Sequence, residues 1–140
     1  MDRNMEFWLK QDDIPSNYIH LPVPPGNYNL NWANNNSSFL VEGMGEVSFL
    51  GKPKLTEITP IESFFPYRYN TYCQYKDFPA PADCVVTIQK MRLSGKPVRF
   101  IITKTLVNIL CSIESFQFGE KDGTGDIYYT LQLKEYRVLK

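Results

Sequence analysis

The sequence predicts a mainly β fold of antiparallel strands with one α-helix at about 82–94. Three observations carry this prediction. Short apolar runs alternate at a period of two, clusters of Gly, Pro, Asn and Ser divide these runs, and one segment has helical spacing. At 140 residues the chain has the length of one domain and can bury a sizeable core, so we expect a single domain over residues 1–140.

The first third of the chain reads as short strands separated by turns. We predict strands at 6–10, 18–23 and 28–32, because the prolines and the glycine of PPGN at 24–27 interrupt regular structure. The segment SFLVEGMGEVSFLG, residues 38–51, predicts a hairpin, since GMG is a loop short enough to join two antiparallel strands.

The next segment is strand-like but interrupted. KLTEITPIESFFP, residues 54–66, is broken by Pro60, which predicts an edge position or a bulge there. From residue 64 to 81 the sequence is rich in aromatic residues and prolines, which argues against regular structure. This segment is either a long loop folded over its own body or a subunit interface, where Tyr, Phe and Arg are enriched.

Residues 81–95 carry the helix signals. Pro81 suits a first helical turn, Asp83 places a carboxylate near the helix start, and Ser94-Gly95 supplies a stop. Val85, Ile88 and Met91 recur on one face, which predicts a helix lying across a sheet or barrel mouth.

Residues 106–136 predict a long hairpin whose tip is GEKDGTGD, residues 119–126. The residues expected on one face of the first strand are Val107, Ile109, Cys111 and Ile113, and those of the second are Ile127, Tyr129, Leu131 and Leu133. A phosphate loop would need a helix directly after its glycines, and a calcium loop would need further ligands beyond Asp122, Thr124 and Asp126. We therefore interpret 119–126 as a solvated hairpin tip.

Charge and cysteine content narrow the classes of function. Fifteen Lys plus Arg balance fifteen Asp plus Glu, and no dense basic cluster is present, so we expect no nucleic-acid binding. A net charge near zero also makes self-association easier. Cys73, Cys84 and Cys111 lack metal-site spacing and are expected to be reduced and mostly buried. No signal peptide or membrane-spanning segment is recognised, so we expect cytoplasmic synthesis and no membrane association.

Few residues in the sequence indicate a catalytic or metal-binding site. His20 is the only histidine and lies in a strand-like context, so we interpret it as structural. Glu42 and Glu46 could face each other across the 38–51 hairpin, but as solvated charges. Cys84 is a conceivable nucleophile because thiols near helix N-termini have lowered pKa values, yet it lacks an evident base. We predict no enzyme activity, no cofactor, no metal and no catalytic residues.

The last two-thirds of the chain resembles a known family. The most specific pieces are FFP with the following YCQY, SGKPVRFIIT after the helix, and the terminal GTGDIYYTLQLKEYR. Over roughly residues 20–138 these resemble the N-terminal domain of LysM-containing baseplate proteins of contractile phage tails, defective prophages and R-type bacteriocins. The resemblance implies an antiparallel β-barrel similar to phage tail-tube proteins.

The resemblance also implies a function in assembly. Such proteins form rings as tube initiators or as adaptors between hub and tube, so the implied partners are further copies in a hexameric ring, the tail tube protein, and a baseplate hub or spike protein. The implied location is the bacterial cytoplasm during assembly and then the baseplate of the particle. Family members continue into a LysM module, whereas this sequence ends at Lys140, so we expect no LysM module and no peptidoglycan binding.

We predict that the aromatic loop and the hairpin tip form the assembly interface. The predicted interface residues are Phe64, Phe65, Tyr67, Arg68, Tyr69, Tyr72, Tyr75, Glu120, Lys121, Asp122 and Asp126. The alternative function is a small-ligand or carbohydrate-binding barrel, favoured by the aromatic content, including Trp8 and Trp32, because aromatic faces stack on sugars and apolar ligands.

Overall fold

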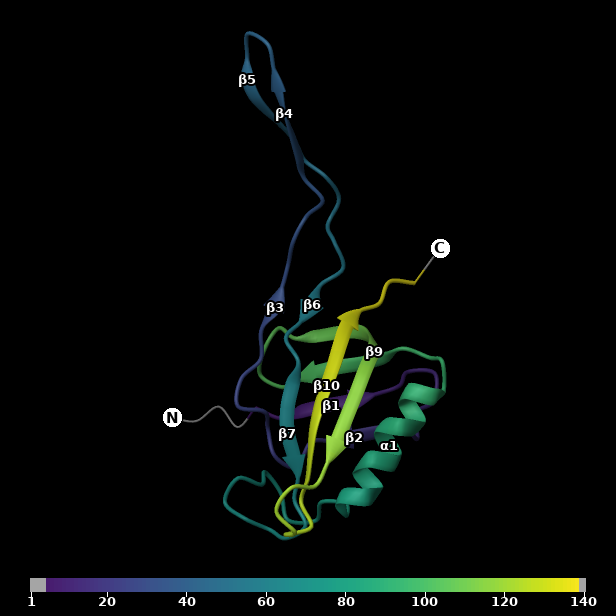
Figure 1. Cartoon of the computed structure of the whole chain (residues 1–140). Helices are drawn as coiled ribbons and strands as arrows, with labels where there is room; N and C mark the ends of the chain where they lie inside the picture. The colour runs from purple at the N-terminus through teal and green to yellow at the C-terminus, as the bar shows by residue number, and fades with distance from the viewer. Residues whose placement is uncertain (1–4, 139–140) are drawn as a thin grey trace.

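Alternating apolar residues form strands in the computed structural model, which describes residues 5–138 (Figure 1). The elements are β1 (Phe7–Lys10), β2 (Tyr18–His20), β3 (Leu30–Asn31), β4 (Ser37–Val41), β5 (Gly45–Phe49), β6 (Glu57–Ile58), β7 (Ile61–Phe65), α1 (Pro81–Leu93), β8 (Val98–Ile102), β9 (Asn108–Gly119) and β10 (Ile127–Glu135). Every strand pairing among them is antiparallel. The predicted mainly β class with one helix is confirmed. Within residues 5–138, no helix has the length and hydropathy needed to cross a membrane.

The main sheet follows the order β2-β1-β8-β9-β10-β6-β3, and β7 also pairs with β10. β9 is the longest strand. It pairs with β8 from Asn108 to Cys111, and with β10 from Cys111 to Gly119. One strand therefore belongs to two parts of the sheet, and Figure 1 shows these parts running in crossed directions around the core.

The sheet curves until its two sides approach each other. The segment that follows β2 lies beside β7, where the Ser63 hydroxyl donates to the Val23 carbonyl at 2.9 Å. Pro60 divides the strand predicted at 54–66 into β6 and β7, and both pair with β10. The predicted interruption at Pro60 is confirmed, because proline cannot donate to a strand ladder.

Helix α1 begins at Pro81 and ends at Leu93, within about a residue of the prediction. Its buried face consists of Pro81, Cys84, Val85, Ile88 and Met91. The buried Gln11 side chain ties the helix end to β1, since its amide donates to the Met91 carbonyl at 3.3 Å and the Ser94 hydroxyl at 2.7 Å. Such bonds satisfy carbonyl groups that a helix C-terminus leaves without partners.

The inward-facing residues of β9 and β10 match the predicted alternation. Tyr129, Leu131 and Leu133 of β10 are buried, and Ile127 packs against the same core. On β9, Ile109 and Cys111 are buried, while Val107 and Ile113 pack against them.

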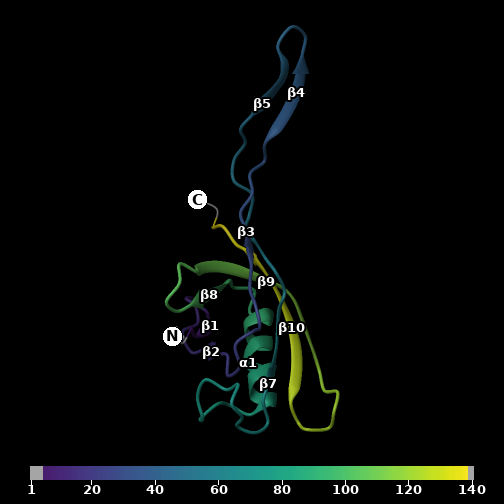
Figure 2. The same ribbon diagram turned by 90° about the vertical axis from the view of Figure 1, so that its left-hand side faces the viewer.

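The molecule has two distinct ends. Figures 1 and 2 show the β4–β5 hairpin extending far from one end of the body, whereas the loop after β7 and the β9–β10 turn lie together at the opposite end. A hydrogen bond joins this loop and this turn, from the Tyr67 N–H to Asp126 Oδ1 at 2.7 Å.

Candidate assembly surfaces

The β4–β5 hairpin is a projecting ribbon (Figure 2). Its strands pair from Ser37↔Phe49 to Val41↔Gly45. The turn needs two left-handed residues, which Gly43 (φ 85°) and Gly45 (φ 79°) provide. The hairpin predicted at 38–51 is confirmed, and we call residues 32–55 the arm.

One face of the arm is apolar. Residues directly opposite each other in an antiparallel pair share a face, so Phe39 and Val41 of β4 lie on the same side as Val47 and Phe49 of β5. The Phe39 and Phe49 rings meet edge to face with centroids 5.2 Å apart, yet each residue is 55% exposed. Burying one such side chain contributes roughly 1.5–3 kcal/mol. This face is therefore suited to contact with another molecule.

The arm carries further exposed apolar side chains. At its tip, residues 40–46, Leu40 is 87% exposed and Met44 is 73% exposed, and Leu50 at the opposite end of the hairpin is 87% exposed. An isolated two-stranded hairpin is marginally stable in water, and clustered exposed apolar residues mark interaction surfaces. The arm therefore has the composition of an element completed by a partner.

Hydrogen bonds continue along residues 33–36 and 51–54, which we call the neck of the arm. The N–H of Asn35 donates to the Lys52 carbonyl at 2.9 Å, and the N–H of Lys54 donates to the Ala33 carbonyl at 2.7 Å. Gly51 donates to the Asn36 side chain at 2.8 Å. A Cβ at Gly51 would lie 1.6 Å from the Asn35 carbonyl oxygen, so glycine is required for this close approach. The neck therefore links the tip to the body by paired backbone.

A hollow of about 750 Å³ lies at the foot of the arm. Its apolar lining is formed by Tyr28, Leu30, Trp32, Leu106, Val107, Ile109, Leu110 and Tyr136. Trp32 is 70% exposed, and Leu106, in the turn between β8 and β9, is fully exposed. We call this site the hollow. Its residues come from three separate parts of the sequence, brought together where β3, the start of β9 and the end of β10 meet.

Basic residues lie next to the hollow. Arg137 follows Tyr136 and donates to the carbonyls of Pro53 and Lys54, each at 3.1 Å, which joins the end of β10 to the arm neck. Lys52 and Lys54 are exposed on the same neck. We call Lys52, Lys54 and Arg137 the basic collar.

Glu135 lies beside the collar, and the positive charge of Arg137 partly offsets the negative charge of its carboxylate. Its carboxylate accepts the Thr56 N–H at 2.8 Å and contacts Arg137 at 3.5 Å. Burial raises the pKa of Glu135, but the hydrogen bonds from Thr56 and the nearby Arg137 outweigh burial and set this pKa below its ordinary value.

The interface residues predicted from the sequence lie at the end opposite the arm. Tyr67, Arg68, Tyr69, Tyr72, Glu120, Lys121 and Asp122 are exposed, and Phe64, Tyr75 and Asp126 are half-buried. The Lys121 ammonium lies 4.1 Å from the Tyr128 ring centroid. Thr124 donates to Asp122, and these hydrogen bonds lower the Asp122 pKa. The structure thus brings the two predicted segments into one surface, whose role in assembly stays a prediction.

The prediction that Phe65 belongs to the assembly interface is wrong, because this side chain lies in the core. Its side chain is 1% exposed and stacks on Tyr129 with ring centroids 4.3 Å apart. Phe64 and Phe65 are consecutive in β7, so they point to opposite faces of the sheet. The phase of β7 gives the reason, since buried Ile61 and Phe65 share the inward face.

The aromatic loop is partly folded onto its own body. The Tyr75 ring stacks on His20 with centroids 4.5 Å apart, and its hydroxyl donates to the His20 carbonyl at 2.7 Å. His20 also stacks on Trp8 at 4.6 Å. His20 therefore occupies a structural position between two rings, as interpreted from the sequence.

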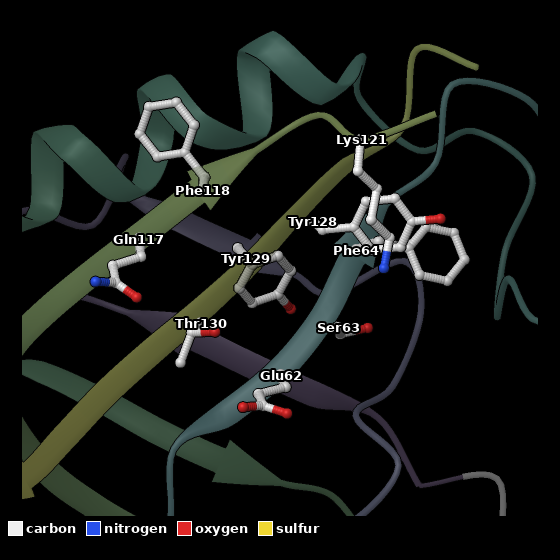
Figure 3. Close-up of a pocket in the computed structure, with 9 residues that line it drawn as sticks. All are labelled: Glu62, Ser63, Phe64, Gln117, Phe118, Lys121, Tyr128, Tyr129 and Thr130. Carbon is white, nitrogen blue, oxygen red and sulfur yellow. The ribbon is translucent and has the colours of Figure 1, made fainter. Parts of the chain in front are cut away.

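A groove of about 560 Å³ follows the outer face of β7, β10 and β9 (Figure 3). Figure 3 shows Lys121 reaching over Tyr128 and Phe64, with Glu62 and Thr130 further along the same face. These side chains form a mixed polar and aromatic sheet surface.

The cysteines lie in the packed interior. The three cysteines are free and buried. Burial raises the pKa of the Cys84 thiol to about 12, with nearby Asp83 adding to the effect. The lowered pKa considered for a nucleophile at the helix start is therefore wrong for Cys84. Within residues 5–138, no three His, Cys, Asp or Glu residues are grouped to hold a metal ion.

The chain has a mainly antiparallel β fold that is like the fold of a phage tail tube. The solved structure of the SPP1 tail tube superposes with a TM-score of 0.52, covering 99% of this chain and 80% of that chain at 14% sequence identity. This likeness shows a shared fold.

In sequence, the chain is 40% identical over 135 residues to the uncharacterized protein YqbP of Bacillus subtilis (strain 168). The match covers 95% of this chain, which spans 59% of the length of that relative. No protein-family model matches the sequence.

Neither the arm nor the hollow was predicted from the sequence as an interaction surface. The arm could have been found from its consecutive apolar residues FLV and FL on a short hairpin, but the hollow requires the folded topology.

Proposed function

We propose that this chain is a structural subunit of a phage-type tail, which acts by gripping further copies of itself and adjoining tail proteins. The observation that carries this proposal is the arm. It projects from a tail-tube-like body and presents an apolar face that includes Phe39 and Phe49, each 55% exposed. A surface of this kind is suited to permanent assembly, because such interfaces are more hydrophobic than transient ones.

The finer proposal locates the subunit in the baseplate. By the sequence resemblance to the N-terminal domain of LysM-containing baseplate proteins, the chain forms a ring, six-membered by family analogy. In this role it starts the tube or adapts the hub to the tube of a contractile tail or R-type bacteriocin. Its partners are then the tail tube protein and a hub or spike protein. The subunit is made in the bacterial cytoplasm and becomes part of the particle, and its role is structural rather than enzymatic.

Substituting the apolar face of the arm tests this proposal. The double variant Phe39→Ser/Phe49→Ser removes the exposed ring pair from the arm. We expect at least a tenfold loss of the chain from particles purified from a producing strain, measured by quantitative mass spectrometry. The thermal unfolding of the isolated protein should change little, because neither ring belongs to the core cluster.

The matched control is Leu93→Ser, which removes another exposed apolar side chain, 71% exposed at the end of α1. This variant should be incorporated normally. Incorporation of the arm variant at the wild-type level would contradict the role of the arm, and functional particles that never contain the chain would contradict the proposed function as a whole.

The second candidate function is small-ligand binding, and the hollow is the observation that favours it. Trp32 offers an exposed aromatic face there, whereas Trp8 is already occupied in the stack with His20. Binding of a sugar or apolar ligand would raise the melting temperature of the isolated protein with ligand concentration. Such a shift, abolished by Trp32→Ala, would favour this second function.

A further inference from the structure

We infer that the arm tip of one copy seats in the hollow of a second copy, beside its basic collar. This inference rests on the proposed function, because it names the surface that receives the arm during assembly. Each copy then carries both a donor surface, which is the arm tip, and an acceptor surface, which is the hollow at the foot of the same arm.

The arm tip of one copy cannot reach the hollow of the same copy. The stretch from Trp32 to Met44 spans about 40 Å if it rises ~3.3 Å per residue. The neck hydrogen bonds keep this stretch paired, and Figures 1 and 2 both show the tip directed away from the body. Because the tip and the hollow lie at opposite ends of the same ribbon, contact between them requires two molecules.

The two surfaces match in polarity. The arm tip presents Leu40 and Met44, which are 87% and 73% exposed. The hollow is lined mainly by apolar side chains, and its volume of about 750 Å³ lies within the range of sites that enclose small apolar ligands. Seating these side chains in the hollow removes both apolar surfaces from water.

Their charges are also complementary. Glu42 and Glu46 flank the arm turn, and no lysine or arginine occurs between Gln11 and Gly51 in the sequence. The arm tip is therefore acidic. The collar beside the hollow carries Lys52, Lys54 and Arg137, and the carboxylate of Glu135, which lines the hollow, is already hydrogen-bonded to Thr56 and Arg137. Opposite charges around an apolar contact favour the correct register and suppress other pairings.

A tip-to-hollow contact joins two different patches. Each copy gives its arm to one neighbour and receives the arm of another, so the contact is head-to-tail. Repetition of such a contact closes into a ring when the rotation between copies permits it, and otherwise continues as a filament. The same geometry predicts that two identical arms do not meet.

Cysteine cross-linking in the native particle tests the inference. The variant Met44→Cys/Leu106→Cys places one thiol on the tip and one in the hollow. A short bismaleimide linker should join neighbouring copies into a covalent ladder of dimers, trimers and higher species. Mixing the two single variants should yield dimers and no longer species, because each copy then carries one reactive thiol. The natural cysteines give little background, since all three are buried.

The control pair is Met44→Cys/Leu93→Cys, whose second thiol is exposed on α1 away from the hollow. This pair should give no ladder. If the chain is incorporated but Met44→Cys links to another copy outside the hollow, or to a different protein, the inference is overturned while the proposed function stands. If the wild-type chain is absent from particles, the proposed function itself fails.

Charge reversal gives an independent readout if the cysteine variants assemble poorly. Glu42→Lys/Glu46→Lys should lower incorporation at least fivefold, and addition of Lys54→Glu should restore a substantial part of it. Restoration by Lys54→Glu supports the pairing of tip and collar. Equal loss with and without Lys54→Glu contradicts it.

Discussion

At the scale of single residues, burial decides which groups are available for contact or chemistry. Phe65 and Cys84 both lie in segments that the sequence marks as functional candidates, yet both are sealed in the core at 1% and 0% exposure. Substituting Phe65 would disturb folding rather than assembly, since removing a buried Phe side chain costs about 3–5 kcal/mol. An interface test at this end should therefore use Tyr67, Tyr69 and Tyr72.

The buried thiols predict the response of the protein to alkaline pH. Burial raises the pKa of both Cys84 and Cys111 to about 12. In the unfolded chain a thiol ionises near pH ~8.5. Because the folded pKa is higher, the stabilising contribution is complete below the unfolded pKa and is lost as the pH rises from about 9 toward 12.

We therefore expect the melting temperature to fall by several degrees between pH 8 and pH 10.5, and Ellman's reagent to react slowly with the folded protein at pH 8. The variant Cys84→Ala/Cys111→Ala should lose part of this alkaline destabilisation, because Tyr75, whose pKa burial also raises to about 12, remains. Rapid labelling of Cys84 in the folded wild-type protein would contradict the account of a buried, neutral thiol.

At the scale of elements, the arm depends on a neck that holds it as a paired ribbon. The neck admits no side chain at Gly51, where a Cβ would overlap the Asn35 carbonyl group. The neighbouring asparagines supply side-chain hydrogen bonds where the two backbones separate. The direction of the tip is thus set several residues away from the surface that makes contact.

The variant Gly51→Ala is expected to break the neck and leave the body folded. The melting temperature of the body should fall by a few degrees at most, because Gly51 lies outside the core cluster. Hydrogen exchange of the β4 and β5 amides should become faster by at least tenfold, measured by mass spectrometry. Gly26→Ala is the matched control, since a Cβ there meets nothing within 4 Å. Unchanged protection of the arm in Gly51→Ala would refute the role given to the neck.

Local signals explain which elements could be predicted from the sequence. The helix is marked by Pro81 and Gly95, and the long hairpin by alternating apolar residues on both sides of a glycine-rich tip. These features depend on residues that are close in the sequence, so they can be recognised without knowledge of the fold. The burial of Phe65 could also have been inferred, because Ile61 and Phe65 share a phase in the strand.

The hollow and the function of the arm depend on long-range arrangement. Trp32, Leu106 and Tyr136 are distant in sequence and meet through the sheet order. The arm residues read as an ordinary hairpin because alternation alone does not reveal whether another layer covers them. The two predicted interface segments likewise come together through the Tyr67–Asp126 hydrogen bond, which no sequence period indicates.

At the scale of the whole molecule, the chain presents different surfaces at its two ends. The arm projects from one end, and the aromatic loop and the β9–β10 turn lie at the other (Figure 1). The hollow lies at the foot of the arm. A subunit with unlike ends can bind different neighbours above and below while its sides contact further copies. This polarity is what the proposed position between a tube and a hub requires.

Imaging of the native particle by electron cryo-microscopy would show where this chain lies and what each arm contacts. We predict density for this chain as a closed ring of identical subunits between tube and hub, in which each arm reaches the hollow of the adjacent copy. Particles in which the chain is absent, or in which it is present with every arm free of contact, would contradict the account.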